Sequence, residues 1–124
     1  MAEVKSYRDL KVWQRAMDLA VAVYTLTKSF PRDEQFGLTS QLRRASSSIA
    51  ANVAEGYGRA SKPAYLNHLR IAQGSLKETE THLLLCARVS ICSAAETDPF
   101  LEQADELGRM LRSLIVSLEA HGGT

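Results

Sequence analysis

The stretch that decides the fold is residues 38–57, LTSQLRRASSSIAANVAEGY. Its larger apolar residues recur at steps of three and four, which places them on one face of a helix: they are Leu38, Leu42, Ala45, Ile49 and Val53. Most positions between them are small, so a neighbouring helix backbone can approach closely. Because serine in mid-helix weakens helix propensity, the segment depends on tertiary packing. We predict a helix over residues 38–57 that is packed in a bundle and closed by Gly56 and Gly58.

The preceding segment, residues 7–29, predicts a first helix with two adjacent apolar rows. One row is Leu10, Trp13, Met17, Ala20 and Tyr24, and the row beside it is Val12, Ala16, Leu19, Val23 and Leu26. A helix in a monomeric bundle needs about one such row. Two rows therefore indicate burial on two sides, within the bundle and against another subunit. Pro31 ends this helix, because proline cannot continue the hydrogen-bond ladder.

The third helix is predicted from residue 62 to about residue 91. Ser61 is a suitable N-cap, and Pro63 lies in the first turn, where proline is tolerated. The apolar row of this helix is Tyr65, Leu69, Ala72, Leu76, Thr79, Leu83 and Cys86.

The fourth helix is predicted from Asp98 as N-cap, with Pro99 at its first position, to His121, before Gly122 and Gly123. Its apolar row is Phe100, Ala104, Leu107, Leu111, Leu114 and Leu118. No strand pattern competes anywhere along the chain. The predicted fold class is therefore all-α, an up-down-up-down antiparallel four-helix bundle in a single domain over residues 1–124.

Composition agrees with one ordinary globular domain, since 45% of the 124 residues are apolar and 23% are charged. No run of about 18 apolar residues is present, so we expect no membrane span. Residues 1–6 lack the apolar region of a signal peptide, and we expect a cytoplasmic protein. Cys86 and Cys92 then read as buried, inert thiols in a reducing compartment.

The net charge of +1 conceals an asymmetry between the two halves of the chain. Residues 1–70 hold eleven Lys and Arg against six Asp and Glu, whereas residues 71–124 hold four against eight. The basic half is suited to a polyanion, or to the acidic half of a neighbouring copy. The candidate nucleic-acid or interface residues are the cations Arg8, Lys11 and Arg15, which share one face of the first helix, together with Arg43, Arg44, Arg59 and Lys62.

The motifs that would indicate catalysis or metal binding are missing. The Glu-x-x-His pairs of bundle di-iron centres are not present, because Thr79 precedes His82 at that spacing and Tyr65 precedes His68. No Gly-x-Ser-x-Gly elbow surrounds the serines at 46–48. We expect no enzyme activity, no cofactor and no metal.

Two polar residues near the end of the second helix are structural candidates. Asn52 and Glu55 lie one turn apart, where the helix dipole disfavours a carboxylate. We therefore predict an arginine partner for Glu55, from this chain or from a neighbouring copy.

Many ordered motifs together resemble one bacterial family. They are Leu10-Lys11-Val12-Trp13, Phe30-Pro31, Glu34, Phe36-Gly37-Leu38, Gln41-Leu42-Arg43-Arg44-Ala45, Ser48-Ile49, Asn52-Val53-Ala54-Glu55-Gly56, Arg59, Ser61, Ile71-Ala72, Gly74-Ser75, Glu78 and Glu80. The sequence resembles the four-helix bundle family named for proteins encoded in intervening sequences of 23S ribosomal RNA genes.

That resemblance implies a ring-shaped homopentamer. The chain is also similar to the accessory proteins of diversity-generating retroelements, basic pentameric barrels that associate with a reverse transcriptase and nucleic acid. Its near-neutral charge departs from that type. By position, the resemblance assigns a role in assembly or ligand binding to Arg43, Arg44, Asn52, Glu55, Gly56 and Arg59.

Two functional hypotheses follow. In the first, a non-catalytic, self-associating bundle contacts RNA or DNA backbone through its basic half, with little sequence specificity. In the second, the chain is a protein-interaction scaffold ring without nucleic-acid binding, and assembly uses the cations. Replacing Arg43 and Arg44 by Glu separates them, because the first hypothesis expects loss of nucleic-acid binding alone and the second expects loss of the oligomer.

Overall fold

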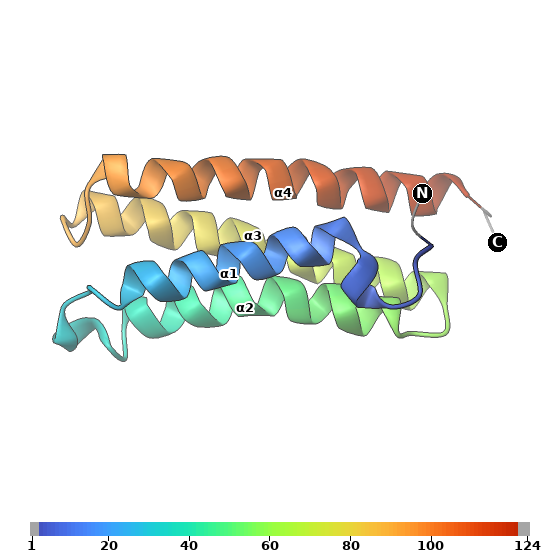
Figure 1. Ribbon diagram of the computed structural model, residues 1–124, viewed down its shortest axis with the longest axis horizontal. Helices are drawn as coiled ribbons and strands as arrows, with labels where there is room; N and C mark the ends of the chain where they lie inside the picture. Colours follow the sequence, from blue (N-terminus) through green and yellow to red (C-terminus); the bar gives the residue numbers. More distant parts are fainter. Residues whose placement is uncertain (1–2, 122–124) are drawn as a thin grey trace.

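The computed structural model describes residues 3–121 and contains four α-helices (Figure 1). These are α1 (Lys11–Thr27), α2 (Leu38–Tyr57), α3 (Lys62–Arg88) and α4 (Ala94–Ala120). Two short 3-10 turns, η1 (Tyr7–Asp9) and η2 (Arg32–Glu34), precede α1 and α2, and no strand occurs between residues 3 and 121. The all-α class with four helices is confirmed. Gly122 and Gly123, predicted to end the fourth helix, lie outside the described residues.

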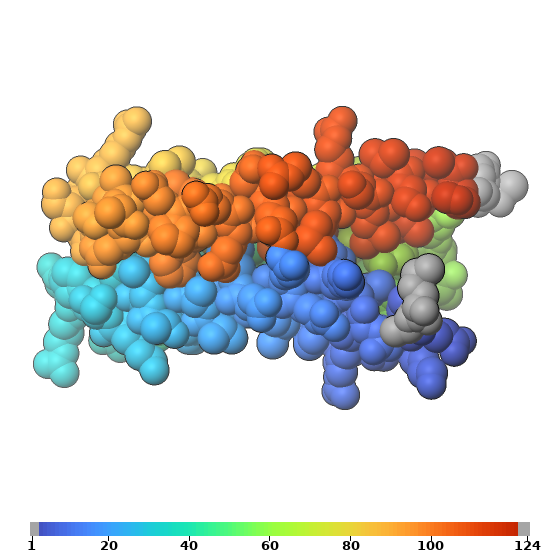
Figure 2. All heavy atoms as spheres, turned by 45° about the horizontal axis from the view of Figure 1, so that its top comes forward, coloured from blue at the N-terminus to red at the C-terminus, as the bar shows by residue number. Residues whose placement is uncertain are grey.

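The four helices lie side by side along the long axis of the molecule (Figure 1). Each helix packs against two neighbours, and the α2–α3 contact is the most extensive. The α1–α2 and α3–α4 links lie at the same end of the molecule, and the α2–α3 link lies at the other end (Figure 1). Turned by 45°, the molecule shows α4 and α1 side by side along its front (Figure 2). Within residues 3–121, no helix combines the length and apolar character needed to cross a bilayer.

The core follows the predicted apolar rows of α2 and α3 closely. Every member of the α3 row except Tyr65 is buried, and in α2 only Leu38 is partly exposed. In α4 the predicted residues Ala104, Leu107 and Leu111 are buried, and Ile115 joins them. The fully buried large side chains are Leu19, Val23, Leu42, Ile49, Val53, Leu69, Leu76, Thr79, Leu83, Thr97, Leu107 and Leu111.

The two apolar rows of α1 have different environments in the folded protein. Val12, Ala16, Leu19 and Val23 face the core, whereas the outer row leaves Met17 and Tyr24 exposed. Val21, which neither row included, is more exposed still. The helix therefore buries one face in this chain and presents a second apolar face to the outside.

Two predicted helix starts are wrong, and capping explains both. Ser6 and Asp9 form a capping box around η1, and Leu10 is extended, so α1 begins at Lys11 rather than near Tyr7. In α4 the cap is Ser93 instead of Asp98. The Ser93 hydroxyl accepts from the backbone of Glu96 at 3.1 Å, and the Glu96 carboxylate accepts from the backbone of Ser93 at 2.9 Å.

This second capping box satisfies two helix-end donors at once, and it outweighs the Asp98-Pro99 signal. Pro99 therefore lies inside α4, near its N-terminal end, rather than at its first position.

The third helix also ends earlier than predicted, at Arg88. Ile91 donates its backbone N–H to the Cys86 carbonyl at 2.9 Å, and Ser90 donates to the Ala87 carbonyl at 3.2 Å. This pair of bonds is a Schellman motif, which requires a left-handed residue after the helix. Ser90 supplies it with a φ of 63°, a conformation that favours glycine.

The two cysteines are buried free thiols near the α3–α4 link, in agreement with their predicted role. Burial and the neighbouring Cys92 raise the pKa of Cys86 to about 12. Burial also raises the pKa of Cys92. Neither thiol is therefore activated as a nucleophile, since the thiolate is the reactive form.

Candidate assembly and anion-binding surfaces

The helices α2 and α3 approach most closely at Gly56. A Cβ at this position would lie 2.8 Å from the Cβ of His68 and 3.2 Å from the backbone oxygen of Tyr65. Only a residue without a side chain fits there without moving α3. Gly56, predicted from the sequence as a helix-closing residue, thus also sets the spacing between the two helices.

Asn52 joins the same two helices through a polar network. Its Nδ2 donates to the Ser48 carbonyl at 2.9 Å, so its Oδ1 faces Nδ1 of His68 at 3.0 Å. The Ser48 hydroxyl in turn lies 3.0 Å from the hydroxyl of Ser75 on α3. Because Oδ1 can only accept, His68 carries a proton on Nδ1. Asn52 therefore connects α2 to α3 through hydrogen bonds to Ser48 and His68.

Glu55 has a different environment from its neighbours Asn52 and Gly56. Its side chain is exposed, and no residue between 3 and 121 forms an ion pair with it. The arginine partner predicted for Glu55 does not come from this part of the chain. A partner from a neighbouring copy stays a prediction.

Three of the seven candidate cations have partners within the chain. Arg15 pairs with Glu106, which links α1 to α4. Lys62 donates to the carbonyl of His121 and so connects the start of α3 to the end of α4. Arg43 is held by the end of α1, where its Nε donates to the Thr27 hydroxyl at 2.8 Å.

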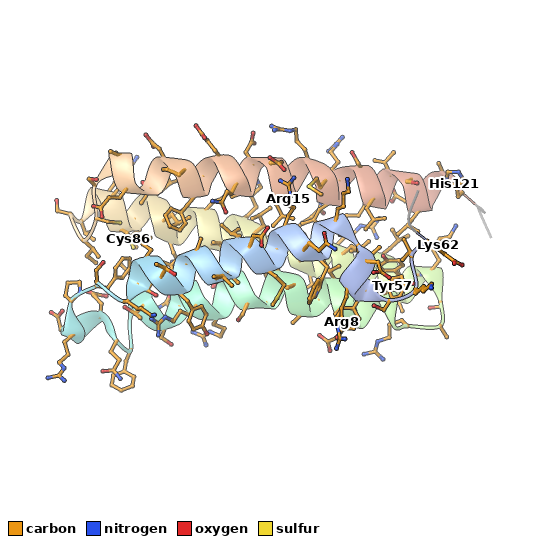
Figure 3. The ribbon with its side chains drawn as sticks, in the orientation of Figure 1. Arg8, Arg15, Tyr57, Lys62, Cys86 and His121 are labelled. Atoms are coloured by element: carbon orange, nitrogen blue, oxygen red, sulfur yellow. The ribbon has the colours of Figure 1, made fainter. Side chains whose placement is uncertain are left out.

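The predicted cationic face of the first helix is not formed. Arg8 belongs to η1, and its guanidinium lies 5.6 Å from the ring centroid of Tyr7. In Figure 3, Arg8 and Lys62 lie toward one end of the molecule, whereas Arg15 lies between α1 and α4 nearer the middle. The extended Leu10 separates η1 from α1. Arg8 is therefore not on the same helix as Lys11 and Arg15, and helical spacing does not place it on a common face with them.

Four candidate cations, Arg8, Lys11, Arg44 and Arg59, have exposed side chains. No carboxylate of residues 3–121 pairs with any of them. Arg8 comes from η1, Lys11 is the first residue of α1, Arg44 lies in the first half of α2 and Arg59 lies in the α2–α3 link, so they do not form one strip along a single helix. Their charges are available to an external anion.

A groove of about 500 Å³ runs over the outer surface of α1 and the start of α2. Its lining contains two arginines and two aromatic residues but no acidic residue: Tyr24, Gln35, Phe36, Thr39, Ser40, Arg43, Arg44 and Ser47. The Arg43 guanidinium lies 4.6 Å from the ring centroid of Tyr24, a cation–π contact. Beside it, the side chain of Phe36 is 89% exposed.

Sequence reasoning missed Phe36 as a surface residue. The available signal was its position, because Phe36 lies between η2 and α2 and outside every apolar row. Because Phe36 falls between two predicted helices, no helical periodicity assigns it to a buried face.

A second group of exposed apolar side chains lies at the end of α3. Leu84, Leu85 and Val89 are between 42% and 52% exposed. Leu84 and Leu85 line a hollow of about 280 Å³ together with Thr81 and Arg88. Exposed apolar groups gathered in this way mark interaction sites more often than single exposed residues do.

The histidines offer no metal centre in the part of the chain that the structure describes. No group of three or more His, Cys, Asp or Glu residues within residues 3–121 is arranged to hold a metal ion. His82 Nε2 lies 3.4 Å from a carboxylate oxygen of Glu78, and the buried Nδ1 of His82 has no hydrogen-bond partner.

Comparison with known proteins agrees with this architecture. The family model described as 23S rRNA-intervening sequence protein matches residues 8–113. Among solved structures, a protein with unknown function from the S23 ribosomal protein family of Bacteroides thetaiotaomicron is similar. It is 27% identical with a TM-score of 0.78, and the match covers 84% of this chain and 94% of that one. No curated protein matches the chain. Because the family model extends from η1 into α4, the chain belongs to the 23S rRNA-intervening sequence protein family.

Proposed function

We propose that this protein is a non-catalytic, cytoplasmic scaffold that self-associates as a homopentamer of up-down-up-down antiparallel four-helix bundles. The observation that carries the proposal is the presence of two separate groups of exposed apolar side chains. One follows the outer face of α1 through Met17, Val21 and Tyr24, and the other lies at the end of α3. Covering apolar surface gains about 25 cal/mol per Å², so association of copies is the favourable way to remove both from water.

Two further observations support the architecture. The links between successive helices alternate between the two ends of the molecule, as an up-down-up-down topology requires (Figure 1). The number five comes from the resemblance to the family. A ring needs two different contact surfaces on each copy, and the two apolar groups lie on different helices, α1 and α3.

Contact with the backbone of RNA or DNA is the second candidate function. It is supported by the exposed side chains of Arg8, Lys11, Arg44 and Arg59, which no carboxylate of residues 3–121 neutralises. One copy offers few such cations, but repetition around a ring multiplies weak contacts. Binding of this kind weakens steeply as salt rises, because it releases counterions from phosphate.

Light scattering on the purified protein at low and high salt, with and without a mixed-sequence RNA oligonucleotide, tests both candidates. The scaffold proposal expects a mass five times the 13.7 kDa of the chain at both salt concentrations. A monomer at both would overturn it. An increase in mass with RNA at low salt that disappears at high salt would support the second candidate, and no increase at either salt would exclude it.

A further inference from the structure

Two surfaces of the bundle combine exposed apolar side chains with charged ones. The head surface consists of Tyr24, Phe36, Arg43 and Arg44, which line the groove over α1 and the start of α2. The tail surface consists of the hollow lined by Thr81, Leu84, Leu85 and Arg88 on α3. We include in it Val89, just beyond α3, and the exposed carboxylates Asp98 and Glu102 of α4, the helix that packs against α3.

We propose that the head surface of one copy docks on the tail surface of the next copy, with the ring of Phe36 inserted into the hollow beside Leu84 and Leu85. This inference rests on the proposed self-association and assigns the surfaces that produce it.

The apolar parts of the two surfaces fit in size. Phe36 is the most exposed of the large apolar side chains in the described chain. The hollow on α3 measures about 280 Å³. An enclosed cavity of about 150 Å³ holds benzene, so the volume of this open hollow is large enough for one phenyl ring. An aromatic anchor that fills a pocket on its partner is the usual source of binding energy at protein interfaces.

The charges are complementary as well. The groove around Phe36 contains Arg43 and Arg44 but no carboxylate. Asp98 and Glu102 are exposed on the N-terminal half of α4, which packs against α3, and no cation of residues 3–121 pairs with them.

A second pair of charges has the opposite arrangement, with the carboxylate beside the head surface and the cation on the tail surface. Exposed Asp33 on η2 lies beside the head surface in the chain, and exposed Arg88 lines the tail hollow. Charges that match in both directions determine the orientation of one copy on the next.

The position of the two surfaces favours a ring over a closed dimer. Both lie at the end of the molecule that carries the α1–α2 and α3–α4 links, and Figure 3 labels Cys86 of α3 at this end. The head surface belongs to α1 and α2, however, and the tail surface to α3 and α4. Each copy can therefore contact two neighbours through two different surfaces that lie at the same level along the long axis of the bundle. Such head-to-tail contacts close into rings when the rotation between copies allows it.

A second copy is favoured over a nucleic acid as the occupant of the head surface. The chain has a net charge of only +1, and the acidic excess of residues 71–124 supplies the matching charge. Aromatic residues and arginine are also the types enriched at protein interfaces.

The test uses two variants, one with the head surface blocked and the other with the tail surface blocked. Phe36→Ser removes the head anchor, and Leu85→Glu places a carboxylate in the tail hollow. Each variant alone is expected to weaken association at least tenfold. It should therefore be monomeric by light scattering even at ten times the concentration at which the wild type is assembled. Val116→Glu on α4 is the matched control, because Val116 is 52% exposed but belongs to neither surface, and its mass should equal that of the wild type.

Mixing the two blocked variants gives the decisive result. Each keeps the surface that the other lacks, so the mixture should form a heterodimer of one Phe36→Ser chain and one Leu85→Glu chain, with no larger species. A self-complementary contact between identical patches would not be rescued in this way. Circular dichroism of each variant verifies that it is folded, and the charge swap Arg44→Glu with Glu102→Arg provides a second route to the same test.

The outcomes separate the two proposals. A monomeric wild type would overturn the proposed self-association. An assembled wild type whose mass is unaffected by Phe36→Ser and Leu85→Glu would overturn the head-to-tail inference alone. If Arg44→Glu abolished RNA binding while the oligomer persisted, the head surface would be a nucleic-acid site and the inference would also be overturned.

Discussion

Gly56 of α2 and His68 of α3 are so close that an added Cβ on the glycine would lie 2.8 Å from the Cβ of the histidine. Four residues earlier on α2, Asn52 accepts a 3.0 Å hydrogen bond from the same histidine. His68 is thus in contact with two successive turns of α2. This relationship holds the most extensive helix–helix contact of the bundle in one register.

Gly56→Ala is expected to destabilise the protein by about 1–3 kcal/mol, because α3 must move away from an overpacked site. The matched control is Gly74→Ala on α3, where an added Cβ meets no atom within 4 Å. That change should stabilise the protein by about 0.5–1 kcal/mol, since alanine is the better helix former. Urea unfolding of both variants measures the difference, and equal effects would contradict the close approach.

Asn52→Leu is expected to cost about 1–3 kcal/mol, because it leaves the Nδ1–H of His68 without its acceptor. Asn67→Leu is the control, since Asn67 is exposed on α3 and makes no hydrogen bond through its side chain in the described structure. Nitrogen NMR should in addition find the Nδ1-protonated tautomer of His68 in the wild type near pH 8. The Nε2-protonated tautomer would argue against the Asn52–His68 bond.

Ser90→Gly is expected to stabilise the protein by about 0.5–1 kcal/mol. The left-handed φ of 63° at this position strains a residue with a side chain, and the Schellman motif favours glycine there. Ser90→Val should have the opposite effect, because a β-branched residue tolerates this conformation least. Thermal unfolding checks the order of the three proteins, which should rise from valine through serine to glycine.

The buried thiol of Cys86 predicts a loss of stability at alkaline pH. Its pKa is about 12 in the folded protein and 9.0 in the reference state, so the folded protein binds the proton more tightly. The free energy of unfolding that this thiol contributes is complete below about pH 9 and declines as the pH rises toward 12.

Between pH 8 and pH 10 the expected decrease in stability is about 1 kcal/mol from Cys86, on the scale of 1.36 kcal/mol per pKa unit. Cys86→Ala removes this contribution and corrects for other groups that titrate in the same range. Urea unfolding at the two pH values measures it. A decrease of the same size in the wild type and in the alanine variant would rule out the thiol as its cause.

Arg59→Gln tests the second candidate function independently of the head surface. If Arg59 contacts a nucleic-acid phosphate, its loss should lower affinity about equally for all sequences and reduce the slope of log affinity against log salt by about 1 per contact removed. Fluorescence anisotropy with a labelled RNA oligonucleotide at several salt concentrations gives the slope. An unchanged slope would show that Arg59 contacts no phosphate.

Features that depend on near neighbours in the chain were predicted well. The apolar rows of α2 and α3 follow from helical periodicity, and both rows are buried except at Leu38 and Tyr65, which are partly exposed. Ser61 caps α3 and accepts from the backbone of Ala64. The predicted start of α4 at Asp98 is wrong because two capping signals lie five residues apart, and the reciprocal bonds between Ser93 and Glu96 outweigh the Asp98-Pro99 signal.

The sequence by itself determined that four long helices form, since helical periodicity, caps and the turn residues between segments act within a few residues of one another. Only the tertiary structure decided which apolar row of α1 faces the core. It also decided that Gly56 lies against His68, that Arg43 packs on Tyr24, and that Phe36 projects into solvent. These relationships depend on how separate helices are positioned, which the packing of the whole core determines and no local pattern records.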